Sequence, residues 1–139
     1  MTTVQKSEFK APSHIAEAGA EPALISSVAP LLGTWKNINK ATRDLVEIVI
    51  SGAASSISVH VFGACSPTPC DWGSVSGLAY AANVSSPTAI AFSAQYTFSF
   101  SKVIVVGHLK GHHLEVETFT QFTDGSGRSN LYTADTMAK

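Results

Sequence analysis

The chain has 139 residues, of which 45% are hydrophobic and only 14% are charged, and its formal net charge is −1. This length fits a single domain with a real core. The scarcity of charge argues against a disordered chain, because disordered chains combine high charge with low hydrophobicity. The nine basic and ten acidic residues form no basic block or stripe, so no nucleic-acid partner is expected.

The apolar runs of the sequence are short. Residues 103–106, for example, fall far below the about 20 residues that a membrane helix needs. Residues 1–13 are polar and lack the basic-then-apolar order of a secretory signal. We therefore expect no membrane partner and take a cytoplasmic location as the default, with secretion left open because a signal removed earlier would leave no trace.

The sequence changes character near residue 33. Residues 1–32 are rich in Ala, Glu and Pro and show no strand-like alternation. Four apolar residues in this leader follow the spacing of one helical face: Leu24, Ile25, Val28 and Leu31. This spacing predicts a short helix over 21–32 that forms a lid across one end of a β domain spanning 33–139, after a mobile tail at 1–12.

From residue 33 onward, β-branched and aromatic residues alternate with Ser, Thr and Gly, and turn residues separate the segments. The pattern predicts about eight strands, over 33–37, 45–51, 57–62, 72–84, 89–100, 103–109, 113–123 and 130–137. Short connections between short strands are typical of an antiparallel meander. We predict an all-β fold, a closed antiparallel β-barrel, because closure removes unpaired edges; a two-sheet β-sandwich is the alternative.

The segment 90–100 has the clearest alternation of the chain. Its odd positions are small or polar, whereas its even positions form a mostly large, apolar row: Ile90, Phe92, Ala94, Tyr96, Phe98 and Phe100. Because successive side chains of a strand point to opposite faces, this row should be buried.

The aromatic row suggests a cavity for a small guest inside the barrel or at its mouth. Apolar walls with a few polar groups are the usual composition of small-molecule sites. The candidate ligand-binding residues are aromatic rings and polar anchors, namely Trp35, Arg43, Trp72, Phe92, Gln95, Tyr96 and Phe98. His60 is a further polar group that could contact the guest.

Two residues are candidates for acid–base chemistry. His60 lies in the middle of a predicted strand, where burial and a carboxylate would tune it as a base; a hydrogen-bonded structural histidine is the plainer interpretation. Glu115 and Glu117 share a strand face at about 7 Å, a separation that suits work on a sugar. Two carboxylates on a solvated face are the commoner case. His60 and Glu117 are thus the catalytic candidates.

Cys65 and Cys70 bracket a stiff loop that contains Pro67 and Pro69. A disulfide is feasible across such a loop, and a reducing compartment would leave two structural thiols instead. A zinc site needs two further ligands, which the histidines are not spaced to supply. The disulfide and the thiols both remain open, and no metal site is predicted.

The tripeptide Gly33-Thr34-Trp35 resembles the start of calycin barrels, in which a Trp near the first strand plugs one end. A longer pattern resembles a family of small, mostly microbial β proteins with no established activity. The matching stretches are 33–37, Thr42-Arg43, 59–65, 67–73 and 119–129, among which Cys70-Asp71-Trp72-Gly73 is the most distinctive. The resemblance implies a fold and no reaction.

The sequence is compatible with three functions. The sequence has no nucleophile elbow, phosphate-binding glycine loop, zincin helix or kinase element, and no cofactor is expected. We predict binding of a small apolar or aromatic molecule in the barrel. A cofactor-free enzyme of the isomerase or cyclase type would use the same cavity. A carbohydrate-binding or interaction module would instead display Trp72 or Tyr132 at the surface. Whether the chain forms a homo-oligomer is left open.

Overall fold

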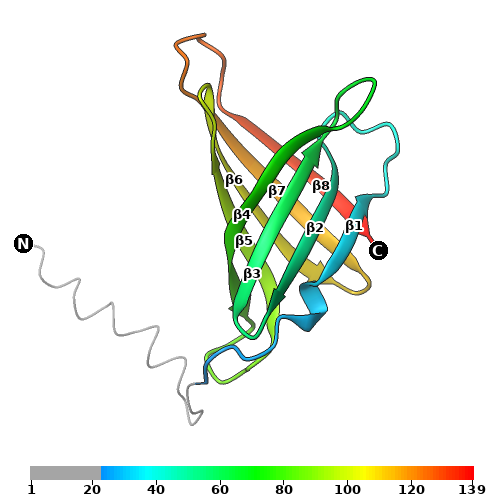
Figure 1. Cartoon of the computed structure of the whole chain (residues 1–139), viewed down its shortest axis with the longest axis vertical. Helices are drawn as coiled ribbons and strands as arrows, with labels where there is room; N and C mark the ends of the chain where they lie inside the picture. The colour runs from blue at the N-terminus through cyan, green and yellow to red at the C-terminus, as the bar shows by residue number, and fades with distance from the viewer. Residues whose placement is uncertain (1–22) are drawn as a thin grey trace, which may run out of the picture.

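The computed structural model describes residues 23–139. One 3-10 turn, η1 (Ala29–Leu31), precedes eight strands: β1 (Gly33–Asn37), β2 (Leu45–Ala53), β3 (Ser56–Gly63), β4 (Cys70–Ala81), β5 (Ala89–Thr97), β6 (Ser101–Lys110), β7 (His113–Phe122) and β8 (Leu131–Ala138). Each strand pairs antiparallel with the next, and β8 pairs with β1, so the sheet closes (Figure 1). The predicted all-β barrel is confirmed, and the sandwich alternative is excluded.

The leader differs from the helix predicted over 21–32. Residues 23–26 have no regular structure, Ser27 forms a parallel bridge to Thr88, and only η1 is helical. The backbone amides of Ser26 and Ser27 donate to the carbonyl oxygen of Pro87 instead of forming helical bonds. The predicted helix is therefore wrong for its described part, and residues 1–22, with the predicted tail, lie outside the described residues. No helix within residues 23–139 is long and apolar enough to cross a membrane.

The leader packs across one end of the barrel, the lower end in Figure 1. Val28 and Leu31 are fully buried and join the barrel core. The indole nitrogen of Trp35 donates to the carbonyl oxygen of Leu31 over 2.9 Å, which satisfies the one polar atom of a buried ring. This end of the barrel is thus filled by the chain's own side chains.

The inward faces of the strands supply the core. On β5 the residues Phe92, Ala94 and Tyr96 are buried, as the alternation predicted. The ring of Phe92 crosses to β6, where a Cβ added to Gly107 would lie 2.5 Å from its Cε1 atom. Glycine at position 107 therefore leaves the space that the Phe92 ring fills.

The two ends of the predicted apolar row are exposed. Ile90 is 38% exposed and Phe100 is 46% exposed, because β5 ends at Thr97 and its ladder with β4 is irregular. Ala81 pairs with Ala89, whereas Tyr80 pairs with Ala91, so a bulge takes Ile90 out of the alternation. The prediction that the whole row is buried is corrected at these two positions.

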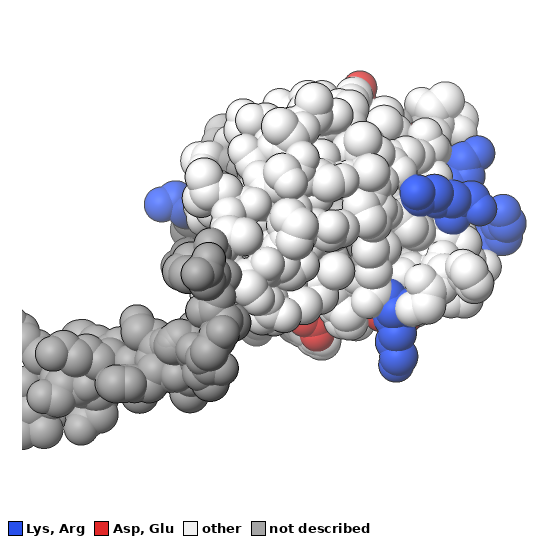
Figure 2. All heavy atoms as spheres, turned by 90° about the horizontal axis from the view of Figure 1, so that it is seen from below, with Lys and Arg blue, Asp and Glu red and all other residues white. Residues whose placement is uncertain are grey.

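The barrel surface carries few charges. Figure 2 shows mostly uncharged side chains on the face seen from below. Among the described residues the ion pairs are His60 with Asp71 and Arg128 with Asp124. The exterior is consequently dominated by neutral polar and apolar groups.

Candidate functional site

A pocket of about 220 Å³ lies at the end of the barrel opposite the leader. The β1–β2, β3–β4 and β7–β8 connections surround this end, the upper one in Figure 1. We call it the mouth pocket and define it by its lining residues, Arg43, Asp44, Leu45, Gly63, Ala64, Cys65, Cys70, Trp72, Thr118, Thr120, Leu131 and Thr133.

The strands β7 and β8 determine how the inner wall changes with depth. Their register brings inward-facing residues opposite each other in layers, which from the mouth inward are Thr120 with Leu131, Thr118 with Thr133, Val116 with Asp135 and Leu114 with Met137. Threonine hydroxyls therefore border the pocket, a carboxyl group lies one layer below, and the core beneath is apolar.

Trp72 provides the aromatic wall of the mouth pocket. Its ring meets the rings of Tyr96 and Phe98 edge to face, with centroids 5.5 Å and 5.6 Å away. It also lies over Gly63, where an added Cβ would be 2.9 Å from the indole nitrogen. Tyr96 and Phe98 stand behind Trp72 and pack against each other with centroids 5.7 Å apart. The predicted rings thus fill the barrel, and room for a guest remains at its mouth.

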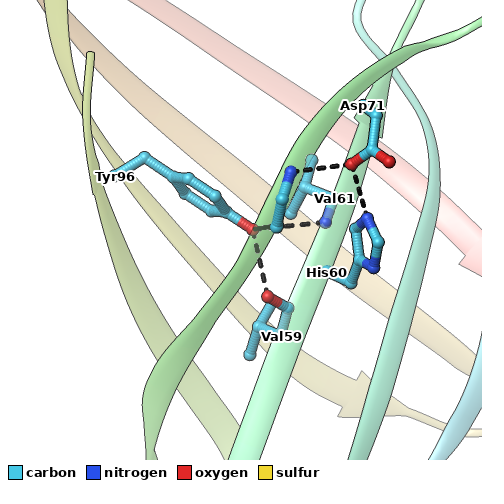
Figure 3. A network of polar contacts seen from close by, with 6 residues as sticks. Val59, His60, Val61, Asp71 and Tyr96 are labelled. Carbon is cyan, nitrogen blue, oxygen red and sulfur yellow. Dashed lines mark hydrogen bonds and ion pairs between the residues drawn. The ribbon is translucent and has the colours of Figure 1, made fainter.

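The hydroxyl of Tyr96 anchors this aromatic cluster to a bulge between β3 and β4 (Figure 3). The register passes from His60 to Phe62, so Val61 has no β4 partner. The amide of Val61 donates to the Tyr96 hydroxyl instead, over 3.2 Å. The same hydroxyl lies 3.0 Å from the carbonyl oxygen of Val59 and 2.8 Å from that of Gly73, to which it donates. Burial raises the pKa of Tyr96.

A polar network lies beside the mouth pocket, around Asp135. Its Oδ1 atom accepts hydrogen bonds from Asn37 Nδ2 over 2.9 Å and from Thr42 Oγ1 over 3.4 Å. Asn37 also donates to the carbonyl oxygen of Leu45. The hydroxyl of Thr42 accepts from the backbone amide of Asp44 over 3.1 Å, so a single side chain connects the two aspartates.

Two buried polar atoms at this end have no hydrogen-bond partner, namely Asp135 Oδ2 and Thr118 Oγ1. Burial raises the pKa of Asp44, and the neighbouring Asp135 raises it further. Two neighbouring carboxyl groups with incomplete partners form the electrostatic centre of the site.

The rim of the mouth pocket carries Arg43 and the β3–β4 loop. Arg43 is exposed, and its guanidinium forms no ion pair within residues 23–139. Cys65 and Cys70 form a disulfide across the Pro-containing loop, with their Cα atoms 5.4 Å apart. The disulfide ties the end of β3 to the start of β4, next to Trp72.

The two catalytic candidates lie outside the mouth pocket. His60 faces outward from β3, and its Nε2 atom contacts Asp71 Oδ1 over 2.6 Å while its ring stacks on Phe62 (Figure 3). The hydrogen bond to His60 and another from the amide of Gly73 lower the pKa of Asp71. Glu117 also faces outward and accepts from the Tyr132 hydroxyl over 2.6 Å. Neither side chain lines the mouth pocket.

The structure separates the remaining predicted residues. Trp35 is buried at the closed end, and Phe92 is buried in the core. Gln95 faces solvent on the outer wall. Arg43 and Trp72 alone of the predicted ligand-binding set line the mouth pocket.

Sequence reasoning missed the carboxyl and hydroxyl groups of the site, Asp44, Asp135 and Thr118. A signal was available in β8, where Leu131, Thr133, Asp135 and Met137 share one face, because an acidic residue on a buried face is unusual.

No group of three or more His, Cys, Asp or Glu side chains in the described part of the chain is arranged to hold a metal ion. The polar centre of the mouth pocket is instead a pair of carboxyl groups beside an aromatic ring. No protein-family model, curated protein or solved structure matches the chain.

Proposed function

We propose that the mouth pocket binds a small molecule with an apolar or aromatic body. The supporting observation is the pocket of about 220 Å³ at the open end, in which Leu45, Trp72 and Leu131 supply apolar surface and threonine hydroxyls supply polar contacts. Apolar walls with few polar groups are typical of ligand sites, and drug-sized ligands need roughly 300–1,000 Å³. The volume therefore favours a guest about the size of one ring.

Benzyl alcohol is a suitable first probe, because it has one ring and one neutral polar group. We expect a saturable change in tryptophan fluorescence on titration, since Trp72 lines the pocket. The chain has two tryptophans, and Trp35 is buried at the other end of the barrel. The variant Trp72→Phe should lose the fluorescence change.

Methyl NMR gives an independent reading of the same titration. The methyl groups of Thr118 and Thr120 should shift with benzyl alcohol, while that of Thr34, exposed on β1, should not. Shifts that grow without saturation, or shifts confined to the outer wall, would contradict the proposal.

A cofactor-free isomerase or cyclase acting in the same pocket remains the alternative. His60 and Glu117 face outward, but Asp44 gives the pocket a titratable group with a raised pKa. Shifted acids in clefts are candidates for acid–base work. Native mass spectrometry can identify a co-purified molecule. Conversion of that molecule by the purified protein would favour this function over binding alone.

A specific observation supports the carbohydrate-binding alternative on the outer wall. A groove of about 530 Å³ crosses β5–β8. Phe119 and Tyr132 border it, 43% and 53% exposed, with ring centroids 5.3 Å apart. The amide side chains of Gln95, Gln121 and Asn130 border it too. Exposed rings beside side-chain amides suit a sugar chain, and Lys102 adds one positive charge to the lining.

A glycan array tests the outer-wall groove separately from the mouth pocket. Binding of a neutral glycan should be lost in the variants Phe119→Ala and Tyr132→Ala and kept in Trp72→Phe. An array without hits would remove this alternative.

A further inference from the structure

Asp44 and Asp135 belong to opposite sides of the mouth pocket's polar centre. Asp44 lines the pocket at the end of the β1–β2 connection. Asp135 comes from β8, one layer below Thr133, and faces inward. The Thr42 hydroxyl accepts from the Asp44 backbone amide and donates to Asp135, which joins the two residues, and the charge of Asp135 acts on the Asp44 carboxyl group.

The negative charge of this pair has no counter-charge in the described chain. The ion pairs within residues 23–139 lie elsewhere, at His60 with Asp71 and at Arg128 with Asp124. Arg43, next to Asp44 in sequence, makes none. The pKa of Asp44 is raised by burial and by Asp135, which means that a positive charge or a proton beside Asp44 would relieve the repulsion.

The site also lacks a hydrogen-bond donor. Asp135 Oδ2 is buried without a partner. Thr118 is 4% exposed, faces inward and lines the pocket, and its hydroxyl oxygen is likewise without a partner. Unpartnered buried polar groups are uncommon, because burial removes their hydrogen bonds to water without replacing them. The unpartnered Thr118 hydroxyl is an observation independent of the acidic pair, and it offers a hydrogen-bond acceptor to an N–H or O–H group of a guest in the pocket.

A primary ammonium group matches both deficits. It combines a full positive charge with three N–H donors in a small volume. The aromatic face of Trp72 adds a further attraction for a cation. A metal ion fits less well, since no cluster of three or more metal-ligating side chains is found in residues 23–139.

We propose that the mouth pocket recognises a small primary amine, whose ammonium group contacts Asp44 and whose apolar body lies against Trp72. Asp135 acts through Asp44, as a positioning residue that increases the local negative charge. This inference rests on the proposed function of the pocket and specifies the chemical class of its guest. Arg43 opposes it only weakly, because a charge on an exposed side chain is screened by water and salt.

The test compares benzylamine, which is an ammonium ion at pH 7, with benzyl alcohol, which has the same shape and no charge. We expect benzylamine to bind at least about tenfold more tightly, because a charge-assisted hydrogen bond is stronger than a neutral one. In Asp44→Asn the ratio of the two affinities should fall to within about twofold. The matched control Asp124→Asn removes an exposed carboxylate of the β7–β8 loop and should keep the wild-type ratio.

Two measurements distinguish an electrostatic effect of Asp135 on Asp44 from a purely structural role of Asp135. In Asp135→Asn the pKa of Asp44, followed by carboxyl carbon NMR, should fall towards its ordinary value, and the amine preference should weaken. In the wild type the preference should decline as the pH is lowered from 7 to 4, because protonated Asp44 no longer attracts a cation. Arg43 from the same connection and Asp135 from β8 are the charged groups around Asp44, while Gly63 at the end of β3 and Ala64 after it carry no charge.

The outcomes distinguish this inference from the proposed function. If both probes bind with equal affinity at pH 7, the ammonium site is refuted and the pocket remains a binding site. If neither probe binds, the proposed function fails as well. Should Asp44→Asn not fold, the wild-type pH series decides: a constant ratio between pH 4 and pH 7 would overturn the inference, and a declining ratio supports it.

Discussion

Replacing Phe92 with Ala is expected to lower the free energy of unfolding by about 3–5 kcal/mol. The ring is 1% exposed and belongs to the central core of the barrel. It also lies over Gly107, whose missing side chain leaves no atoms to move into the space. The loss should therefore include a cavity in addition to the lost transfer free energy, and urea denaturation measures it.

The matched control is Phe119→Ala on the outer wall, where the same ring is removed from a position that is 43% exposed. Its effect should stay below about 1 kcal/mol. The close contact of the two positions also predicts that their effects on the free energy of unfolding are coupled. Gly107→Ala should destabilise the wild type and have little effect in the Phe92→Ala variant, because the added methyl group and the ring would occupy the same space. Equal losses for Phe92→Ala and Phe119→Ala would show that the ring does not fill the core.

Strand positions could be predicted from the sequence because alternation is a local property. The row in β5 identified Phe92, Ala94 and Tyr96 as buried, and turn residues separated the eight strands. The bulge that exposes Ile90 was not predictable in this way, because it depends on how β5 pairs with β4. The leader helix failed for a related reason, since its amides find their partners in Pro87, in the β4–β5 connection.

The candidate site was predicted only in part. Arg43 and Trp72 line the mouth pocket, and both were identified from residue type. Thr42 and Asp135 are 93 residues apart, so their contact, and the pairing of Asp44 with Asp135, follow from barrel closure. For Glu117 the sequence held a warning, since it alternates with Val116, which is buried.

Replacing Tyr96 with Phe tests whether a single hydroxyl stabilises the irregular part of the barrel wall. The ring should stay in place, because Trp72 and Phe98 hold it on two sides. The amide of Val61 loses its partner, and the bulge leaves no strand neighbour to replace it. A buried group without a partner costs about 1–3 kcal/mol, and we expect that loss of unfolding free energy in urea.

The control for this prediction is Tyr132→Phe, which removes an exposed hydroxyl that donates to Glu117. Its effect should be within about 0.5 kcal/mol, as water replaces the bond. Hydrogen exchange adds a local reading: in Tyr96→Phe the amide of Val61 should exchange faster, while that of Val105, in the regular ladder between β5 and β7, should follow global stability alone. An unchanged exchange rate at Val61 would mean that the bulge finds its hydrogen bonds without Tyr96, and the aromatic cluster would then be held at the mouth by ring packing.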